Sequence, residues 1–290
     1  MLSILIPTYN DDCRTLVKTL ADQAQRAALA GWEIIVADDG STDADVVTRN
    51  ASIQTLPGCR FVRNEKNMGR AAIRNFLVAQ AAGDRLLFVD ADMHVSRADY
   101  LQRYAEAFAL GDVVYGGYDI EGGTRENLRF VYEDHGKKNH SAQMRNQHPY
   151  SDFHTSNFMV ARQVMQAIPF DERFRYYGYE DVFFGKQLQT HGVSIVHIDN
   201  PVAFRDFETN ANFLSKSKEG VRTLRVFRKE LKGFSPLLTL AEKLQRMYLK
   251  SLITCVFRLL EKAMLHNLYS TRPSLFIFQF YKLGYYLTLD

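Results

Sequence analysis

Short apolar runs alternate with helix-compatible segments over the first ninety residues of the chain. The apolar runs are three to five residues long and lie at residues 2–6, 33–37, 60–62 and 86–89. Between them, residues 12–30 and 70–82 carry apolar positions spaced three and four apart, as on one face of a helix. This alternation predicts an α/β fold with a mainly parallel central sheet flanked by helices.

The pattern changes after residue 111. Further strands are predicted at residues 112–117, 157–161 and 192–198, and the polar stretch 122–150 reads as a long loop or mobile insertion. Apolar positions recur with three-and-four spacing from 236 to 267, which predicts one long helix, and the aromatic run at 275–286 needs a covering surface. We therefore expect a first domain over residues 1–215 and a basic, amphipathic helical extension over 216–290.

Composition places the chain among ordinary globular proteins. Hydrophobic residues make up 46% and charged residues 24% of its 290 positions, which is enough for a well-formed core. A formal net charge of +3 is too small to indicate a nucleic-acid partner. The basic excess is concentrated between residues 216 and 262, where twelve Lys or Arg face four Glu.

Compartment signals are consistent with the cytoplasm. The three cysteines, Cys13, Cys59 and Cys255, are an odd number at wide spacing, so neither a disulfide framework nor a metal motif is indicated. The first residues lack a secretory pattern, and no apolar stretch approaches the roughly 18 residues of a membrane span. We expect a cytoplasmic protein, with contact at the inner face of the cytoplasmic membrane left open.

Acidic residues follow two of the predicted strands. Asp38 and Asp39 come after the second strand, and Asp90 and Asp92 after the fourth. In open parallel sheets ligands gather beyond the carboxyl ends of the strands, and carboxylates at i and i+2 suit a hard cation such as Mg²⁺ or Mn²⁺. The competing interpretations are ordinary strand-end acids at 90–92 and a helix-capping turn at 39–41.

A third acidic group, Tyr179-Glu180-Asp181, stands at the start of an amphipathic helical pattern. Acids in the first turn of a helix are favoured by the helix dipole alone. The functional interpretation is that Asp181 acts as a general base on an attacking hydroxyl while Glu180 contacts the acceptor.

Taken together, these motifs resemble the inverting glycosyltransferases of family 2, which have the GT-A fold. The resemblance covers roughly residues 1–215, in the family's order. The matching segments are Pro7-Thr8-Tyr9-Asn10, Asp38-Asp39-Gly40-Ser41-Thr42, the segment 67–75 from Asn67 to Asn75, Asp90-Ala91-Asp92 and Gly178-Tyr179-Glu180-Asp181.

The resemblance implies a role for each matching residue. Asp92 would hold a divalent metal, Mn²⁺ or Mg²⁺, at the donor diphosphate, and Asp181 would be the catalytic base, assisted by Glu180. The donor would be bound by Pro7, Thr8, Tyr9, Asp39, Arg70, Asp90 and Ala91. The acceptor would be bound by His154, Asn157 and Tyr179.

One position departs from the family pattern. Phe204 stands where many GT-A enzymes carry a metal-binding His, and Phe cannot ligate a metal. Either Asp92, donor and water hold the metal, or His197 or Asp206 substitutes, or metal dependence is lost. The competing interpretation of His197 is an ordinary strand residue.

The implied function is transfer of a hexosyl or N-acetylhexosaminyl group from a nucleotide-sugar, UDP-linked by resemblance, to a saccharide or lipid-linked acceptor in polysaccharide or glycolipid synthesis. A non-catalytic nucleotide-sugar-binding or accessory subunit is the alternative. A nucleotidyltransferase would need a glycine-rich phosphate loop after the first strand, which this chain lacks. The C-terminal helices suit either peripheral membrane contact or packing, including a homo-oligomer.

Overall fold

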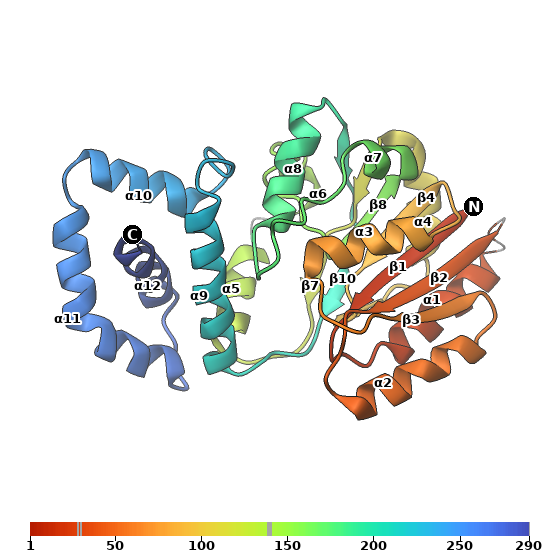
Figure 1. Ribbon diagram of the computed structural model, residues 1–290, viewed down its shortest axis with the longest axis horizontal. Coiled ribbons are helices and arrows are strands. Elements are labelled where there is room, and N and C mark those ends of the chain that lie inside the picture. The colour runs from red at the N-terminus through yellow and green to blue at the C-terminus, as the bar shows by residue number, and fades with distance from the viewer. Residues whose placement is uncertain (28, 30, 138–140, 290) are drawn as a thin grey trace. The chain divides into compact units, whose positions relative to one another are not determined.

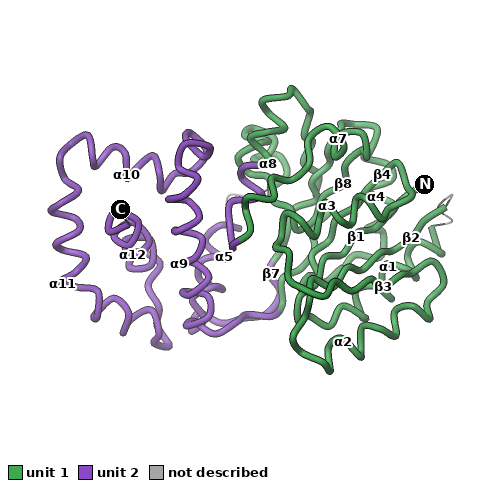
Figure 2. Tube along the Cα trace, viewed as in Figure 1, with its two compact units in different colours: residues 1–119, 140–175, 184–205 green, residues 120–139, 176–183, 206–290 purple. Residues whose placement is uncertain are grey.

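The computed structural model describes residues 1–27, 29, 31–137 and 141–289. The chain divides into two compact units, neither of them continuous in sequence (Figure 2). Unit 1 comprises residues 1–119, 140–175 and 184–205, and unit 2 comprises residues 120–139, 176–183 and 206–290. The boundary expected after residue 215 falls inside α9 (Asn210–Val226), because that helix continues unbroken across it.

Unit 1 is built on a seven-stranded sheet with the strand order β3-β2-β1-β4-β8-β6-β9. The strands are β1 (Leu2–Thr8), β2 (Trp32–Asp38), β3 (Cys59–Arg63), β4 (Arg85–Val89), β6 (Val113–Tyr115), β8 (Asn157–Ala161) and β9 (Ile195–His197). β8 runs antiparallel to both of its neighbours, and the remaining pairs are parallel. The prediction of a mainly parallel sheet is confirmed.

Helices cover both faces of this sheet, which is why its central strands are apolar without alternation. Ile73 and Leu77 of α3 pack on one face against Leu5, Ile35 and Phe88. Figure 1 shows α1 on the opposite side, as right-handed crossovers require for a chain that reverses direction along the sheet after β3. The helices of this part of the chain are α1 (Arg14–Arg26), α2 (Ala44–Ala51), α3 (Arg70–Gln80), α4 (Tyr100–Ala107), α6 (Ala142–Arg145), α7 (Arg162–Ala167) and α8 (Glu180–Thr190).

The carboxyl ends of β1 and β2 lie level with each other. Thr8 pairs with Asp38, and the next strand along, β4, pairs with the other side of β1 through Leu5 and Phe88. The turns that follow these three strands therefore open at the same edge of the sheet. A second, three-stranded sheet has the order β5-β10-β7, with β5 (Met93–His94), β7 (Tyr118–Ile120) and β10 (Val202–Phe204).

Unit 2 is helical. It contains α5 (Leu128–Lys137), α9, α10 (Pro236–Arg246), α11 (Lys250–Tyr269) and α12 (Leu275–Thr288). Its core joins Phe213 of α9, Phe257 of α11, and Phe278 and Tyr281 of α12. The aromatic run near the C-terminus is thus covered largely by the neighbouring helices of its own unit.

Two predictions for secondary structure are wrong. The single long helix expected over 236–267 is two helices, separated at Tyr248, whose φ of 59° cannot continue an α-helix. The polar stretch 122–150 is not a plain loop, because it contains α5 and α6. Within the described residues, no helix combines the length and apolar character needed to cross a bilayer.

Candidate active site

Asn10 fastens the turn after β1 to the turn after β2. Its φ of 60° lies in the left-handed region, which Asn tolerates better than most residues. The side-chain oxygen accepts hydrogen bonds from the backbone N–H groups of Thr42 and Asp43, both at 2.9 Å. The Asn10 N–H donates to the Ser41 hydroxyl at 2.8 Å. The first two predicted motifs therefore form one structure at the strand ends.

The residues just before Asn10 differ in accessibility. Thr8 is buried and its hydroxyl donates to the carbonyl of Asp11 at 3.1 Å, whereas Tyr9 is 43% exposed. Pro7 is half-buried. An exposed aromatic ring beside the strand ends is suited to stacking on a planar base. Tyr9 therefore offers the most accessible side chain of the predicted trio.

Asp38 is a buried anchor beneath this turn. One of its oxygens accepts the Ser41 N–H at 3.0 Å and also the Ser41 hydroxyl, and the other lies 3.3 Å from Nε of Arg63. The capping residue of α2 is Asp43, whose side chain accepts two backbone N–H groups of the first turn. The interpretation of 39–41 as the helix cap is therefore not needed to explain these residues.

Asp39 is held by backbone donors at the start of α3. Its two oxygens accept the N–H groups of Met68 at 2.7 Å and Gly69 at 3.0 Å. Burial raises the pKa of the Asp39 carboxyl, and these two hydrogen bonds partly oppose that shift. Asp39 thus fixes the loop that precedes α3, and Arg70, the exposed first residue of that helix, follows directly.

Two glycines allow these loops to approach each other. Gly40 has a φ of 72°, and a Cβ there would lie 2.6 Å from the carbonyl carbon of Lys66. Gly69 has a φ of 92°, and a Cβ there would lie 2.8 Å from the carbonyl oxygen of Arg175. A side chain at Gly40 would push the turn after β2 away from the loop before α3, and a side chain at Gly69 would push that loop away from the backbone of Arg175.

Asp90 is paired with a buried arginine. The Arg74 guanidinium lies 2.8 Å from Asp90, with side-chain exposures of 2% and 19% respectively. Arg74 also donates to the carbonyl of Arg70 at 3.3 Å. The ion pair fixes the position of Asp90 at the end of β4, one residue before Ala91, which is buried.

Breaking this ion pair is expected to destabilise the protein strongly. Replacing Arg74 with Met should lower the free energy of unfolding by about 3 kcal/mol, because Asp90 loses its partner in a poorly solvated position. Urea unfolding of both proteins measures the difference. Replacing Arg14 with Met removes a surface pair with Asp12 and should cost less than about 1 kcal/mol. Equal costs for the two variants would contradict this assignment.

Asp92 lies in a tight turn after β4 and is half-buried. The Met93 N–H closes the turn on the carbonyl of Asp90 at 3.1 Å, and Met93 pairs with Phe204 across the β5–β10 ladder. Phe204, buried at this ladder, supplies no ligand. Among the described residues, no three or more His, Cys, Asp or Glu side chains are grouped closely enough to hold a metal. Mg²⁺ and Mn²⁺ commonly use one or two carboxylates with phosphate oxygens and water, so Asp92 fits a metal that arrives with a diphosphate.

His197 does not serve as the missing metal ligand. Nδ1 accepts a hydrogen bond from Nε of Arg145 at 3.1 Å, which leaves Nε2 as the donor to the carbonyl of Pro149 at 2.9 Å. Burial lowers the pKa of His197 to about 4, and the nearby Arg145 charge adds to the shift. The interpretation of His197 as an ordinary strand residue is therefore the one its contacts support.

The lowered pKa of His197 predicts an acid-sensitive contribution to stability. The unfolded chain takes up a proton near pH 6.5, whereas the folded imidazole does so only near 4. Stability present above pH 6.5 is therefore lost as the pH falls toward 4, by about 3 kcal/mol. Chemical unfolding across this range should show a shallower loss for His197→Gln than for the wild type. His191→Gln, at an exposed histidine, should keep the wild-type slope, and an unchanged slope in His197→Gln would refute the assignment.

Asn157 is a structural residue, which corrects its assignment to the acceptor site. It is fully buried, and its oxygen accepts the hydroxyls of Tyr100 at 2.5 Å and Tyr104 at 2.7 Å. Its nitrogen donates to the carbonyls of Gly117 at 2.6 Å and Asn200 at 2.9 Å. These four bonds exhaust the carboxamide.

His154 remains a candidate for the acceptor side. It is half-buried, and its ring lies edge-on to Tyr118, with centroids 5.9 Å apart, and tilted against Tyr115 at 6.3 Å. These contacts orient the imidazole without burying it completely.

The Tyr179-Glu180-Asp181 motif belongs to unit 2. Tyr179 has a φ of 70°, and its carbonyl accepts the N–H of Phe183, so α8 begins directly after it. Glu180 is buried and Asp181 is half-buried, with one Asp181 oxygen accepting the N–H of Val182 at 2.8 Å. A tyrosine in this backbone conformation is strained by about 1–3 kcal/mol, which is frequent at functional sites.

Helix α9 holds the segment that carries this motif. The Tyr177 N–H donates to Glu219 at 3.1 Å, and the Thr223 hydroxyl donates to the Tyr177 carbonyl at 3.0 Å. Gly178, with a φ of 91°, approaches Gly220 so closely that a Cβ would lie 3.3 Å from its Cα. The acidic motif is therefore positioned by the C-terminal helices.

Tyr179 makes a further link to these helices. Its side chain is hydrogen-bonded to Ser235, the residue that caps α10. Burial is the main cause that raises the pKa of the Tyr179 hydroxyl to about 12, so it stays protonated near neutral pH.

A family comparison matches the part of the chain that forms these strand ends. The model of the glycosyl transferase family 2 aligns with residues 3–168, more than half of the chain. The chain belongs to glycosyl transferase family 2. The turns after β1, β2 and β4 all lie inside the matched region of this family 2 chain, whereas residues 176–183 and the C-terminal helices lie beyond it.

Solved structures share the fold of this family 2 chain at low sequence identity. The mannosyltransferase PcManGT from Pyrobaculum calidifontis, in complex with GDP-Man and Mn²⁺, has a TM-score of 0.57 at 15% identity, covering 99% of this chain and 84% of that one. TarS 1–349 from S. aureus, in complex with UDP-GlcNAc, has a TM-score of 0.54 at 16% identity, covering 98% and 90%. The expected GT-A fold is confirmed.

Among curated proteins, chondroitin synthase from Escherichia coli is 27% identical over 240 residues, which cover 70% of this chain and 34% of that protein. Four other curated relatives are matched over 15% to 50% of their own length. The family 2 chain therefore corresponds to only part of these relatives.

Two features of the family 2 site were missed by the sequence analysis. Arg74 lies on the same face of α3 as Ile73 and Leu77, and a charged residue on an otherwise apolar helix face was the available signal. Asp38 was noted in its motif, but nothing in the sequence indicated that Arg63 of β3 would pair with it. Both pairs depend on strand order, which the local pattern does not contain.

Proposed function

We propose that the protein transfers a sugar from a UDP-linked donor to an acceptor hydroxyl with inversion at the anomeric carbon. The observation that carries the proposal is the alignment of the acidic turns after β1, β2 and β4, which are neighbouring strands. Membership of family 2 supports a nucleotide-sugar as the ligand of this edge. The proposal covers both hexosyl and N-acetylhexosaminyl donors.

On the donor side, each residue has a proposed task. The exposed Tyr9 stacks on the base. Asp39 fixes the loop that presents Arg70 to the base or diphosphate. Asp90, which is held by Arg74, faces the ribose. Pro7, Thr8 and Ala91 shape the backbone around the donor. TarS, solved with UDP-GlcNAc, supports UDP as the first choice, and PcManGT, solved with GDP-Man, makes GDP the comparison donor.

Asp92 is the proposed protein ligand for Mn²⁺ or Mg²⁺. When bound, such a cation stabilises negative charge on the departing diphosphate. PcManGT was solved with Mn²⁺, which supports a divalent metal in this fold. Because Phe204 supplies no ligand, the remaining positions are left to donor oxygens and water.

Asp181 is the proposed general base. The acceptor oxygen attacks the anomeric carbon, the bond from that carbon to the diphosphate oxygen breaks, and the acceptor proton passes to Asp181. Glu180, with Tyr179 and His154, orients the acceptor. The acceptor is a saccharide or a lipid-linked saccharide, which corresponds to a step in polysaccharide or glycolipid synthesis at the cytoplasmic side.

A direct experiment compares UDP-linked and GDP-linked sugars in the presence of Mn²⁺. A bound donor should raise the melting temperature, because ligand that binds the folded state stabilises it by mass action. Release of free nucleoside diphosphate then reports turnover. No stabilisation by any nucleotide-sugar contradicts the proposal.

The second candidate is a nucleotide-sugar-binding protein without turnover. Phe204 beside the turn of Asp92 favours it, because among the described residues Asp92 does not belong to any group of three or more His, Cys, Asp or Glu side chains that could hold a metal. Stabilisation by a donor, with no nucleoside diphosphate released across a panel of saccharide acceptors, would support this candidate.

A further inference from the structure

Helix α11 has an apolar face that its own unit leaves open. Phe257, Met264 and Leu268 on one side are buried in the unit 2 core. On another side Leu252 is 59% and Leu259 is 78% exposed. Helix α11 has 20 residues and is about 30 Å long. One of its apolar sides packs in the unit 2 core, and the exposed leucines on the other side suggest a surface that binds a partner outside the unit.

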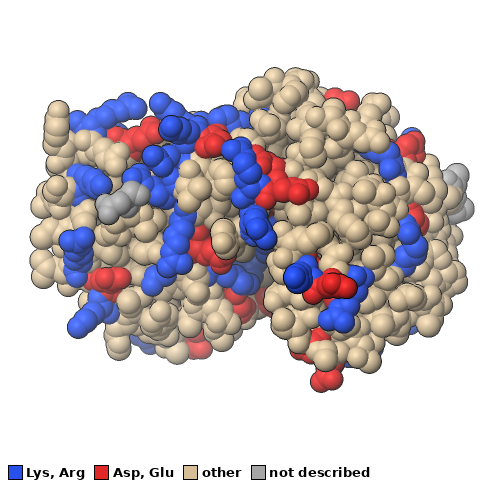
Figure 3. Space-filling model, viewed as in Figure 1, with Lys and Arg blue, Asp and Glu red and all other residues tan. Residues whose placement is uncertain are grey.

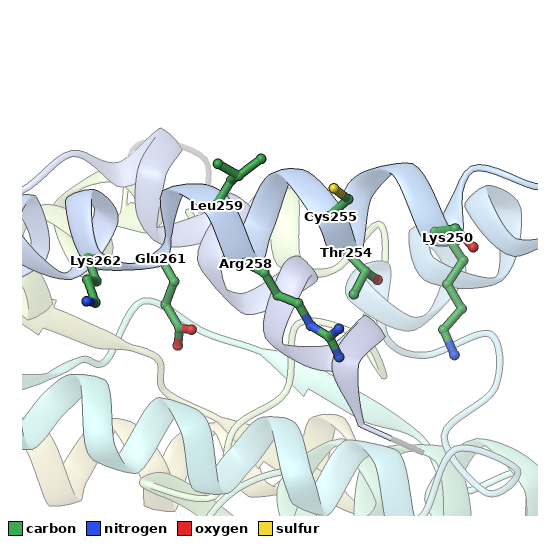
Figure 4. Close-up of a pocket in the computed structure, with 8 residues that line it drawn as sticks. Lys250, Thr254, Cys255, Arg258, Leu259, Glu261 and Lys262 are labelled. Atoms are coloured by element: carbon green, nitrogen blue, oxygen red, sulfur yellow. The ribbon is translucent and has the colours of Figure 1, made fainter.

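Cations accompany this open face. Residues 242–262 contain five Lys or Arg and two Glu. Lys250, Arg258 and Lys262 line a surface groove of about 840 Å³ along α11, together with Ser251, Thr254 and one acid, Glu261. In Figure 4, Leu259 and Cys255 point to one side of α11, and Arg258 and Lys250 point to the other.

None of these three cations is neutralised within the described part of the chain: Lys250, Arg258 and Lys262 form no ion pair there. On the face shown in Figure 3, Lys and Arg gather over unit 2. We call the solvent-facing part of α11 the α11 face: Leu252, Cys255 and Leu259 lie along one flank of it, and Lys250, Arg258 and Lys262 lie along the other.

The corner before α11 has a related character. Tyr248 is 93% exposed although its φ of 59° is unfavourable for a tyrosine, and Met247 beside it is 54% exposed. In water, the exposed ring of Tyr248 makes no packing contact with the described residues that would offset the strain of this backbone conformation. Tyrosine is enriched at the level of lipid headgroups, where its ring contacts apolar chains and its hydroxyl remains hydrated.

We propose that the α11 face binds the surface of an anionic phospholipid bilayer. The apolar row enters the boundary between headgroups and acyl chains, and the cations contact lipid phosphates. A two-fold contact with a second copy of the chain fits less well, because the same basic patch would then face itself. This binding is independent of the donor site, so its test requires neither donor nor acceptor.

Flotation with lipid vesicles tests the proposal on the full-length protein. Vesicles of phosphatidylcholine with phosphatidylglycerol should carry the protein upward, and vesicles of phosphatidylcholine alone should carry much less. Raising the salt concentration should weaken the binding, because screening reduces the attraction of the cations. Equal binding to both kinds of vesicle, or binding to neither, overturns the proposal.

Matched variants then identify the surface. Arg258→Gln with Lys262→Gln should lower partitioning onto anionic vesicles about 25-fold, at about fivefold per charge. Leu252→Ser with Leu259→Ser should lower it at least about tenfold. The control combines Leu110→Ser, at a leucine 63% exposed in unit 1, with Arg26→Gln, at an exposed arginine of α1, and should bind as the wild type does.

Thermal melts verify that each variant is folded, which is expected because all of the altered side chains are exposed. Folded variants that still bind as strongly as the wild type would overturn the assignment. A wild-type dimer in light scattering that dissociates in the Leu252→Ser, Leu259→Ser variant would also overturn it, because the α11 face would then be a contact between copies.

Discussion

Replacing Asp181 with Asn is expected to lower the turnover number for sugar transfer about 100- to 10,000-fold, the range typical for loss of a general base. The affinity for the donor should stay within about twofold of the wild type, because the proposed role of Asp181 is to accept the acceptor's proton and the substitution removes no proposed donor contact. Turnover is measured as release of nucleoside diphosphate with acceptor present, and donor affinity by calorimetry.

Asp45→Asn is the matched control for this variant. Asp45, which is exposed, lies like Asp181 in the first turn of a helix, here α2, so both substitutions remove the same interaction with a helix dipole. Only Asp181→Asn should lose turnover. Near wild-type turnover in Asp181→Asn would remove this residue from the mechanism while leaving the donor site untouched.

Replacing Asp92 with Asn is expected to weaken binding of the UDP-sugar in Mn²⁺ roughly 100-fold, or about 3 kcal/mol. The physical reason is the loss of the carboxylate that is proposed to hold the cation against the diphosphate. Calorimetric titration of the donor in Mn²⁺, and again in excess chelator, measures the effect.

The chelator experiment supplies the control. Without a divalent cation the wild type and Asp92→Asn should bind the donor equally weakly, since the substitution then removes no metal contact. If the wild type binds the donor equally well with and without Mn²⁺, donor binding does not depend on a metal, and the proposed role of Asp92 is wrong.

The sheet of this protein could be predicted from local sequence because its central strands are buried on both faces. Such strands are continuous apolar runs, and those at β1, β2 and β4 stand out against the polar turns that follow them. The same turns carry the motifs, so the donor-side residues could be placed at one edge before any coordinates were known. The antiparallel β8 could not be assigned its direction in this way, because strand order and orientation are set by contacts between distant segments.

The helical part was harder to predict. Apolar spacing continues through Tyr248, and nothing in that spacing reveals that the backbone turns there into the left-handed region. Helix α5 was not predicted because residues 122–150 are mostly polar and Leu128 is the residue of this helix that is buried. A helix stabilised by a small contact with a distant partner leaves a weak periodic signal.

The candidate site shows the same difference between what local sequence determines and what tertiary contacts determine. The sequence determined which carboxylates follow which strands, because those positions depend on local pattern alone. Only the tertiary structure decided what each side chain is bound to. Arg74 forms an ion pair with Asp90, and two backbone N–H groups donate to Asp39. Asn157 uses its carboxamide in hydrogen bonds within the protein.

Tertiary structure also decided that α9 positions the segment of Asp181 through Tyr177 and Gly178. The physical reason is general. Motif identity depends on neighbours along the chain, whereas hydrogen-bond partners and burial depend on residues tens of positions away, whose approach is fixed only when the whole core packs.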